Sequence, residues 1–190
     1  MITASQWKRH VLPLLDDPAT WGWRNKLAYR RPVDWVLLGV LAEGSGFQRD
    51  RAYVWEVHMP LFVPHESVWL THGDRVPHGA RTVGLDEPED FVAVVRQALA
   101  RVPSQADALA AISRSNGEEG AYALLLLGQV DLAERRLAEP FWPDAHGPHL
   151  EEARRRRGEV AGALQAGGPG AAVDLLRSWR DATMASIGIS

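Results

Sequence analysis

The sequence predicts an α+β protein, with a helix-covered antiparallel β-meander followed by an all-helical array. Two observations carry this prediction. Residues 27–72 contain apolar runs, alternating or continuous, that are separated by turn residues, a pattern typical of strands. Beyond residue 83 the apolar positions recur at helical spacing. We therefore expect a region with the sheet over residues 1–82 and a helical region over 83–190, packed against each other.

The first element is expected to be a short helix with a well-marked start. Thr3 and Gln6 occupy the two positions of a capping box, and Trp7 lies where a hydrophobic staple would place an apolar residue. Pro13 cannot donate a backbone hydrogen bond, so the helix should kink or end just before it. Residues 16–22 then have the composition of a loop.

Three segments are expected to form the main strands. Residues 33–41 are almost continuously apolar, which favours a strand covered on both faces, although a short buried helix has the same pattern. Residues 52–59 alternate, with the aromatic side chains on one side, and residues 67–71 return as a further strand. We expect the aromatic face of this meander to be its core face, covered by the first helix through Trp7.

Helical periodicity then continues to the end of the chain. The clearest helix is predicted over residues 88–102, where apolar residues follow the helical rule without a break and a proline ends the run. Further helices are predicted at 105–114, 117–127, 131–138, 149–166 and 170–186.

Two of the predicted helical hairpins share a short pattern. A glycine, an alanine five residues later and a leucine four residues after that occur as Gly128, Ala133 and Leu137 and again as Gly167, Ala172 and Leu176. The pattern describes a tight turn, a close helix approach and a side chain that fills the groove. It resembles the inter-helix turn of tetratricopeptide repeats. A generic helical hairpin explains the same spacing.

Tryptophan is unusually frequent in the first part of the chain. Six of the eight tryptophans fall within the first 69 residues. Four of them are expected in the core: Trp7, Trp35, Trp55 and Trp69. The other two, Trp21 and Trp23, are expected in a loop and are followed by Arg24, Lys26, Arg30 and Arg31. Aromatic and basic side chains together suit an anionic or planar ligand or a partner surface, and the alternative is that both tryptophans are core or interface anchors.

A second candidate site is a group of histidines, His58, His65, His72 and His78, with Asp74 close by. Imidazoles and carboxylates could hold zinc or non-haem iron, or Asp74 could orient His72 as a general base. If His58 and His72 lie on neighbouring strands, a register offset of four residues separates them by roughly 13 Å, whereas a different register brings them together. The alternative is that these are surface histidines of a meander.

Several function classes lose support. The chain has no cysteine and lacks the phosphate-loop, dinucleotide, zinc-protease and nucleophile-elbow motifs. We predict no cofactor. The net charge of −3 argues against nucleic acid as a partner, and the basic run Arg154–Arg157 is interpreted as a solvated, salt-bridged helix. The absence of an apolar leader or long apolar run predicts a cytoplasmic protein without membrane contact.

Several segments resemble a group of uncharacterised bacterial proteins. They are Leu12–Leu15, Lys26–Arg30, Tyr53–Trp55, Pro60–Pro64 and Leu70–Arg75, with 133–137 and 178–183 in the helical half. The resemblance implies a bacterial origin and a single architectural unit, and it implies no activity. The N-terminal part is also similar to small α+β domains found near bacterial toxin–immunity loci.

The leading functional hypothesis is a non-enzymatic binding or adaptor protein with an unidentified protein partner. One alternative is a metal-dependent or histidine-based hydrolase that uses residues 58–78. Another is an immunity-type inhibitor of a bacterial toxin, which predicts a neighbouring toxin gene. Sequence patterns determine neither the ligand nor the oligomeric state.

Overall fold

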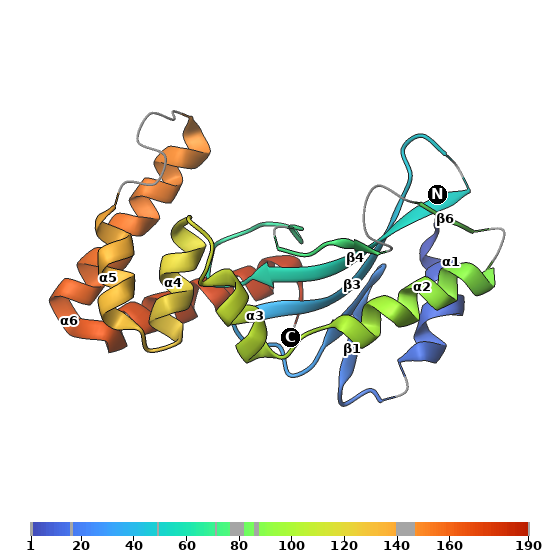
Figure 1. The fold of residues 1–190 in the computed structure, drawn as a ribbon, viewed down its shortest axis with the longest axis horizontal. Helices are drawn as coiled ribbons and strands as arrows, with labels where there is room; N and C mark the ends of the chain where they lie inside the picture. The colour runs from blue at the N-terminus through green and yellow to red at the C-terminus, as the bar shows by residue number, and fades with distance from the viewer. Residues whose placement is uncertain are drawn as a thin grey trace. The chain divides into compact units, whose positions relative to one another are not determined.

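A computed structural model describes residues 2–15, 17–48, 50–70, 72–76, 82–85, 88–139 and 147–189. Within these residues an antiparallel meander is followed by helices, so the predicted α+β class is confirmed (Figure 1). The chain divides into two compact units. The sheet unit comprises Met1–Met59 and Val68–Ser104, and the helical unit comprises Pro60–Ser67 and Gln105–Ser190. Each unit therefore contains residues from both sides of position 82.

The sheet of the described residues has the strand order β1-β2-β3-β4-β5, with β6 paired to β4 as well. Its strands are β1 (Trp21–Arg24), β2 (Leu27–Arg30), β3 (Val36–Gly44), β4 (Arg51–Pro60), β5 (Arg75–Val76) and β6 (Val83–Gly84). Consecutive strands are neighbours, which is the predicted meander. The strand predicted over 33–41 begins at Val36, so Trp35 precedes it and is only half-buried.

Helix α1 (Ala4–Val11) begins as predicted, with a complete capping box. The Gln6 backbone N–H donates to Thr3 Oγ1 at 3.1 Å, and the Thr3 N–H donates to Gln6 Oε1 at 2.9 Å. The helix tightens into a 3₁₀ turn, η1 (Leu12–Leu14), at Pro13. Trp7 and Val11 lie on its buried face. Helix α2 (Pro88–Arg101) packs against β3, β5 and β6, and α1 packs against α2.

The prediction that this side of β4 is a core face is wrong for its aromatic residues, although Val57 and Met59, which alternate onto the same side, are fully buried. Ala52 and Val54 are fully buried, whereas Tyr53 and Trp55 on the opposite face are only half-buried. The guanidinium of Arg75 on β5 lies 4.2 Å from the centre of the Tyr53 ring and 4.4 Å from that of Trp55. An aromatic ring can stack on a cation while part of it remains in water, so alternation alone does not identify the core face.

The strand predicted over 67–71 is also wrong for its described residues, because 67–70 have no regular structure and position 71 lies outside the described residues. Trp69, expected in the core, is 57% exposed. Its backbone N–H donates to the sulfur of Met59 at 3.3 Å. The antiparallel partner of β4 on this side is β5, which takes the place expected for residues 67–71.

The helical unit contains α3 (Gln105–Ile112), α4 (Glu118–Leu126), α5 (Val130–Ala138) and α6 (Pro148–Ile187), close to the predicted helices. Gly168 has a φ of 72° and divides α6 in two, which agrees with the helices predicted over 149–166 and 170–186. Ala133 and Ala172 are fully buried, as the repeated pattern requires of a residue at a close helix approach.

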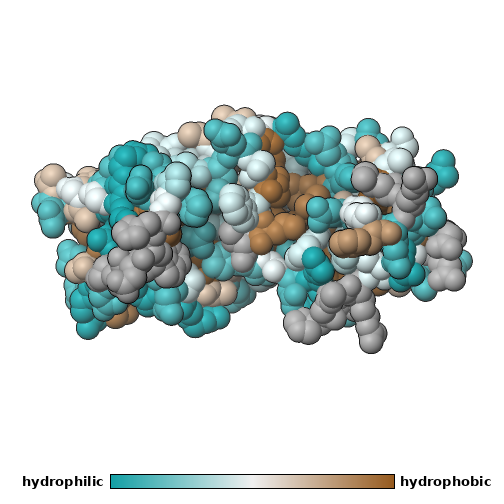
Figure 2. Space-filling view, turned by 90° about the horizontal axis from the view of Figure 1, so that it is seen from above, coloured by the Kyte–Doolittle hydropathy of each residue, from teal (hydrophilic) through white to brown (hydrophobic). Residues whose placement is uncertain are grey.

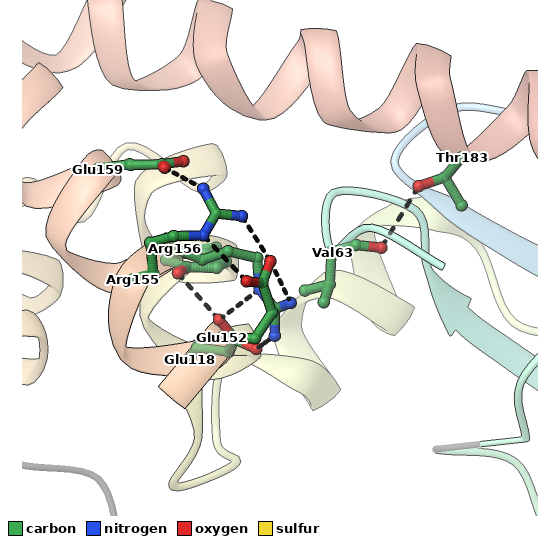
Figure 3. A network of polar contacts seen from close by, with 8 residues as sticks. Val63, Glu118, Glu152, Arg155, Arg156, Glu159 and Thr183 are labelled. Carbon is green, nitrogen blue, oxygen red and sulfur yellow. Dashed lines mark hydrogen bonds and ion pairs between the residues drawn. The ribbon is translucent and has the colours of Figure 1, made fainter. Parts of the chain in front are cut away.

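The helical unit also contains the segment Pro60–Ser67, which follows β4 in the sequence. Leu61 and Phe62 are fully buried, and Val63 is 2% exposed. The Thr183 hydroxyl on α6 donates to the Val63 carbonyl at 3.4 Å, as Figure 3 shows, and the Ser186 hydroxyl donates to the His65 carbonyl at 2.7 Å. The apolar core of the helical unit therefore includes three side chains from a segment that is not helical.

Candidate functional site

The first candidate site is built on the hairpin of β1 and β2. Trp21 and Trp23 were expected in a loop, but they lie on β1, and this expectation is wrong. Arg24 pairs with Leu27, so only Asn25 and Lys26 form the turn. Asn25 has a φ of 53°, a left-handed conformation that asparagine tolerates and that two-residue hairpin turns require. An Asn-Gly pair would have signalled this turn; Asn-Lys is a weaker signal.

Trp23 is the exposed aromatic residue of this hairpin. Its side chain is 42% exposed, whereas Trp21 is half-buried. The centre of its ring lies 6.3 Å from that of buried Trp7, and Lys8 Nζ lies 4.5 Å from the ring centre. One face of the Trp23 ring is therefore anchored against α1, while a large part of the side chain remains in contact with water.

Within the part of the chain that the structure describes, Lys8, Arg24 and Arg31 form no ion pair with a carboxylate. Helix α1 and residues 21–31 contain six Lys and Arg residues and no Asp or Glu. Arg30 Nη1 donates to the carbonyls of Val102 and Pro103, at 3.3 and 3.4 Å. Arg31 Nη1 donates to the Pro18 carbonyl at 3.3 Å. A carbonyl dipole orients a guanidinium but leaves its net charge in place.

Asp17 is an acidic residue in the turn before β1. Its carboxylate accepts hydrogen bonds from the Ala19 N–H and the Thr20 hydroxyl, and these bonds lower its pKa. Asp17 is thus engaged within its own turn. We call Lys8, Trp23, Arg24 and Arg31 the cationic hairpin surface.

The second candidate site is a ladder of titratable side chains on β4 and residues 72–75. The recorded register pairs Val54 with Val76 and Trp55 with Arg75, and the Glu56 N–H donates to the Asp74 carbonyl at 2.8 Å. Continued by two and four residues, this register places Glu56 opposite Asp74 and His58 opposite His72. Directly opposite residues have Cβ atoms about 5 Å apart. The four-residue offset considered from the sequence is therefore wrong.

Burial and neighbouring charges shift the pKa values of Glu56 and His58 in this ladder. Glu56 is 7% exposed and forms an ion pair with Arg101 Nε of α2 at 2.8 Å. Burial raises the pKa of Glu56, the Arg101 charge opposes the rise, and Asp74 adds to it. Burial also lowers the pKa of His58, with a further contribution from the charge of His72. The site is thus a partly buried acid–base cluster at the C-terminal end of α2.

His65 does not belong to this cluster. It lies in the helical unit, where burial lowers its pKa, Glu119 opposes the effect and Arg156 adds to it. Across the described ranges, no group of three or more His, Asp or Glu side chains is arranged to hold a metal ion. His78 lies outside the described residues. The ladder thus has the elements of acid–base chemistry without a metal site in the part of the chain that is described.

A buried polar network in the helical unit was missed by the sequence interpretation (Figure 3). Glu118 Oε2 accepts from Tyr122 Oη and from Arg156 Nε, both at 3.1 Å, and Glu118 Oε1 pairs with Arg156 Nη2. The Glu118 and Arg156 side chains are only 9% and 11% exposed. Arg155, in contrast, pairs with Glu152 and Glu159 on the surface, as predicted for this basic run.

For both Glu118 and Arg156, burial and the partner's charge shift the pKa in opposite directions. Burial raises the pKa of Glu118, and the Arg156 guanidinium and the Tyr122 hydroxyl oppose it. Burial alone would lower the pKa of Arg156, but the hydrogen bond and charge of Glu118 raise it. A carboxylate that accepts three hydrogen bonds is stabilised in its ionised form. We therefore describe Glu118 and Arg156 as an ion pair at neutral pH.

A groove of about 490 Å³ lies between α5 and α6. It is lined by Glu134, Leu137, Ala138, Arg157, Ala161, Leu164 and Gln165, so its walls are partly apolar and carry charges of both signs. None of the site residues predicted from the sequence lines it.

Few large hydrophobic side chains are exposed among the described residues. The face drawn in Figure 2 is mostly hydrophilic, with hydrophobic side chains gathered in one area. The large hydrophobic side chains that are most exposed are Trp23, Phe47, Trp69 and Leu132. None of the helices described combines the length and the apolar composition needed to span a membrane.

Comparison with known proteins adds no relative from which a role could be transferred. No protein-family model, no curated protein and no solved structure matches the chain significantly. The function of the protein is therefore inferred from the geometry of the two candidate sites.

Proposed function

We propose that the protein is a binding or adaptor module that recognises another protein through the cationic hairpin surface. The observation that carries this proposal is Trp23, which is 42% exposed and has the Lys8 ammonium 4.5 Å from its ring centre, with no carboxylate paired to Lys8 among the described residues. Tryptophan and arginine are the side chains most enriched in the energetic centres of protein interfaces. An anchored but exposed indole has already lost much of its conformational freedom, so binding costs less entropy.

The alternative use of the two tryptophans, as core residues, is consistent with Trp21 but not with Trp23. An exposed indole gives up part of the free energy that burial would supply, about 25 cal/mol per Å² of apolar surface. Arg24 adds to the surface because it is exposed and no ion pair is recorded for it within the described residues. Arg30 is exposed as predicted, and its guanidinium donates to the Val102 carbonyl after α2.

Affinity purification from native lysate of the source organism tests the proposal. Trp23→Ala removes the anchor, and Phe47→Ala is a matched control because Phe47 is 96% exposed in the turn between β3 and β4. We expect the wild type and Phe47→Ala to recover one protein in stoichiometric amount and Trp23→Ala to lose it. Recovery of no stoichiometric partner, or its retention by Trp23→Ala, would contradict the proposal.

A second candidate function is acid–base catalysis at the ladder of Glu56, His58, His72 and Asp74. The register that places both pairs on one face favours it, since catalytic groups with shifted pKa values cluster in this way. Metal analysis of the purified protein and a hydrolase screen of His72→Ala test this candidate. A metal-free protein whose activity in the screen is indifferent to the substitution removes it.

An inhibitor of a bacterial toxin is a special case of the proposed binding function. It would use the same cationic hairpin surface against an acidic patch of the toxin. A toxin gene next to the gene for this protein supports this case, and purified toxin that is recovered equally well by Trp23→Ala contradicts it.

A further inference from the structure

We infer that the partner is bound as an extended acidic segment that adds a strand to the sheet along β1. This inference rests on the proposed function and specifies the chemistry of the partner. It follows from three properties that meet at β1: an unpaired sheet edge, an anchored indole beside it, and cations on both faces of the edge.

β1 lies at the end of the strand order, and within the described residues it pairs only with β2. The Arg31 N–H donates to the Thr20 carbonyl at 2.7 Å. Hydrogen-bonded and non-hydrogen-bonded pairs alternate in an antiparallel ladder, so Gly22 and Arg24 direct their backbone groups to β2. Trp21 and Trp23 direct theirs to the open edge.

The open edge is not fully occupied by the chain itself. The Trp21 N–H donates to the Asp17 carbonyl at 2.8 Å. The N–H and C=O of Trp23 and the carbonyl of Trp21 are directed outward with no hydrogen bond recorded from the described residues. An extended peptide is the ligand that satisfies such groups, as in other cases of strand addition.

The cations lie on both faces of this edge. Lys8 and the Trp23 ring are on the face covered by α1. Arg24 alternates with Trp23 along β1 and is on the other face, where Arg31 lies 5.7 Å from the Tyr29 ring centre. Successive side chains of an added strand alternate between the two faces. Adjacent acidic residues in one extended segment would therefore meet Lys8 on one face and Arg24 and Arg31 on the other.

Gly22 keeps the second face of the hairpin flat. A Cβ at this position would lie 2.4 Å from the Tyr29 ring, so only glycine lets the ring lie across β1. The ring in turn supports Arg31, whose Nη2 donates to Tyr29 Oη at 3.4 Å. The cation is thereby held beside the edge on a two-strand platform.

The test uses the full chain and a fluorescently labelled peptide of repeating Glu-Glu-Val, with a Lys-Lys-Val peptide as the charge control. We expect the acidic peptide to bind, the basic peptide not to bind, and the affinity to fall with added salt. Lys8→Glu and Arg24→Glu should each weaken binding about fivefold. The control is a charge reversal outside the proposed binding edge. Glu89→Lys, in the first turn of α2, should leave the affinity for the acidic peptide unchanged within about twofold.

The strand geometry is tested separately from the charge. Trp23→Ala and Trp23→Pro both lack the indole, but only the proline variant lacks the outward N–H. We expect Trp23→Ala to weaken binding about tenfold and Trp23→Pro to weaken it about fivefold more. If the proline variant unfolds, a Glu-Glu-Val peptide methylated on alternate backbone nitrogens makes the same comparison on the wild-type protein. Equal affinity with and without the methyl groups overturns the inference.

Other occupants of the edge give distinct results. A single-stranded oligonucleotide that binds more tightly than the acidic peptide overturns the inference in favour of nucleic acid. Concentration-dependent self-association that Trp23→Pro abolishes overturns it in favour of a second copy of this chain. If no acidic peptide binds but the stoichiometric lysate partner still depends on Trp23, the inference fails and the proposed function stands.

Discussion

Replacement of Glu118 by glutamine should destabilise the protein by about 3 kcal/mol, because it leaves a buried guanidinium without its counter-charge. Arg156 is 11% exposed, and Glu118 supplies it with a bidentate contact through both carboxylate oxygens. Glutamine preserves the volume and can still accept the hydrogen bond from Tyr122. The cost therefore comes from the unpaired charge and not from a cavity.

The magnitude lies at the lower end of the range for broken buried ion pairs, about 3–5 kcal/mol. Glu152 remains 3.4 Å from Arg156 Nη1, and it retains part of the compensation. Glu152 is itself 42% exposed, so its pairing is weakened by water. Glu152→Gln is accordingly the matched control, since it removes one carboxylate charge from the same guanidinium and should cost less than Glu118→Gln.

Urea unfolding followed by far-UV circular dichroism at neutral pH measures these differences. A double variant, Glu118→Leu with Arg156→Met, separates charge from packing because it removes both charges together, and it is made in a Tyr122→Phe background so that no buried hydroxyl is left without its acceptor. It should lie within about 1 kcal/mol of the Tyr122→Phe variant. A cost for Glu118→Gln no larger than that of Glu152→Gln would refute the reasoning. A double variant as unstable as the single one would also refute it, by showing that the polar contacts themselves stabilise the helical unit.

Three further predictions follow from other buried residues. The pKa of Glu56 is raised in the folded state, so stability should fall as the pH rises above its ordinary value near 4.5; Glu56→Gln should flatten this decline in urea unfolding measured across pH. The pKa of His58 is lowered, so its contribution is present above about 6.5 and is lost as the pH falls, and His58→Gln should flatten that loss in the same assay. Phe62→Ala should lower the free energy of unfolding by about 3–5 kcal/mol and reduce hydrogen-exchange protection in α4 and α6. Unchanged protection in these helices would contradict the assignment of Phe62 to the core of the helical unit.

Local rules predicted the elements whose signals lie within a few residues of one another. The capping box of α1, the end of that helix at Pro13 and the alternation of residues 52–59 all depend on neighbours in the sequence. The break of α6 near Gly168 is of the same kind, because glycine and proline stand side by side there. Such signals are independent of what the element packs against.

Predictions that depended on the packing partner were less successful. The pattern of β4 correctly predicted a strand, but alternation does not show that Val54 is fully buried while Trp55 is half-buried and stacks on Arg75. Arg156 was assigned to a solvated face because Glu152 and Glu159 lie within pairing distance along the helix. Its principal partner, Glu118, is 38 residues away in sequence, and helical spacing contains no information about it.

The titratable ladder shows why the second candidate site could not be predicted from spacing. In an antiparallel ladder, the position numbers of paired residues add up to the same value at every pair. A shift of the register by one residue would change this sum by one and move His72 to the other face of the sheet. A hairpin turn normally sets this sum, but residues 61–70 leave the sheet and pack in the helical unit as far as Ser67. Gly73 allows the close approach of the two segments, since a Cβ at this position would lie 1.6 Å from the Glu56 carbonyl oxygen. Because a side chain at position 73 would clash with this carbonyl, glycine there permits the register in which Asp74 lies opposite Glu56 and His72 opposite His58, and a register set between two distant segments cannot be predicted from the spacing of the histidines.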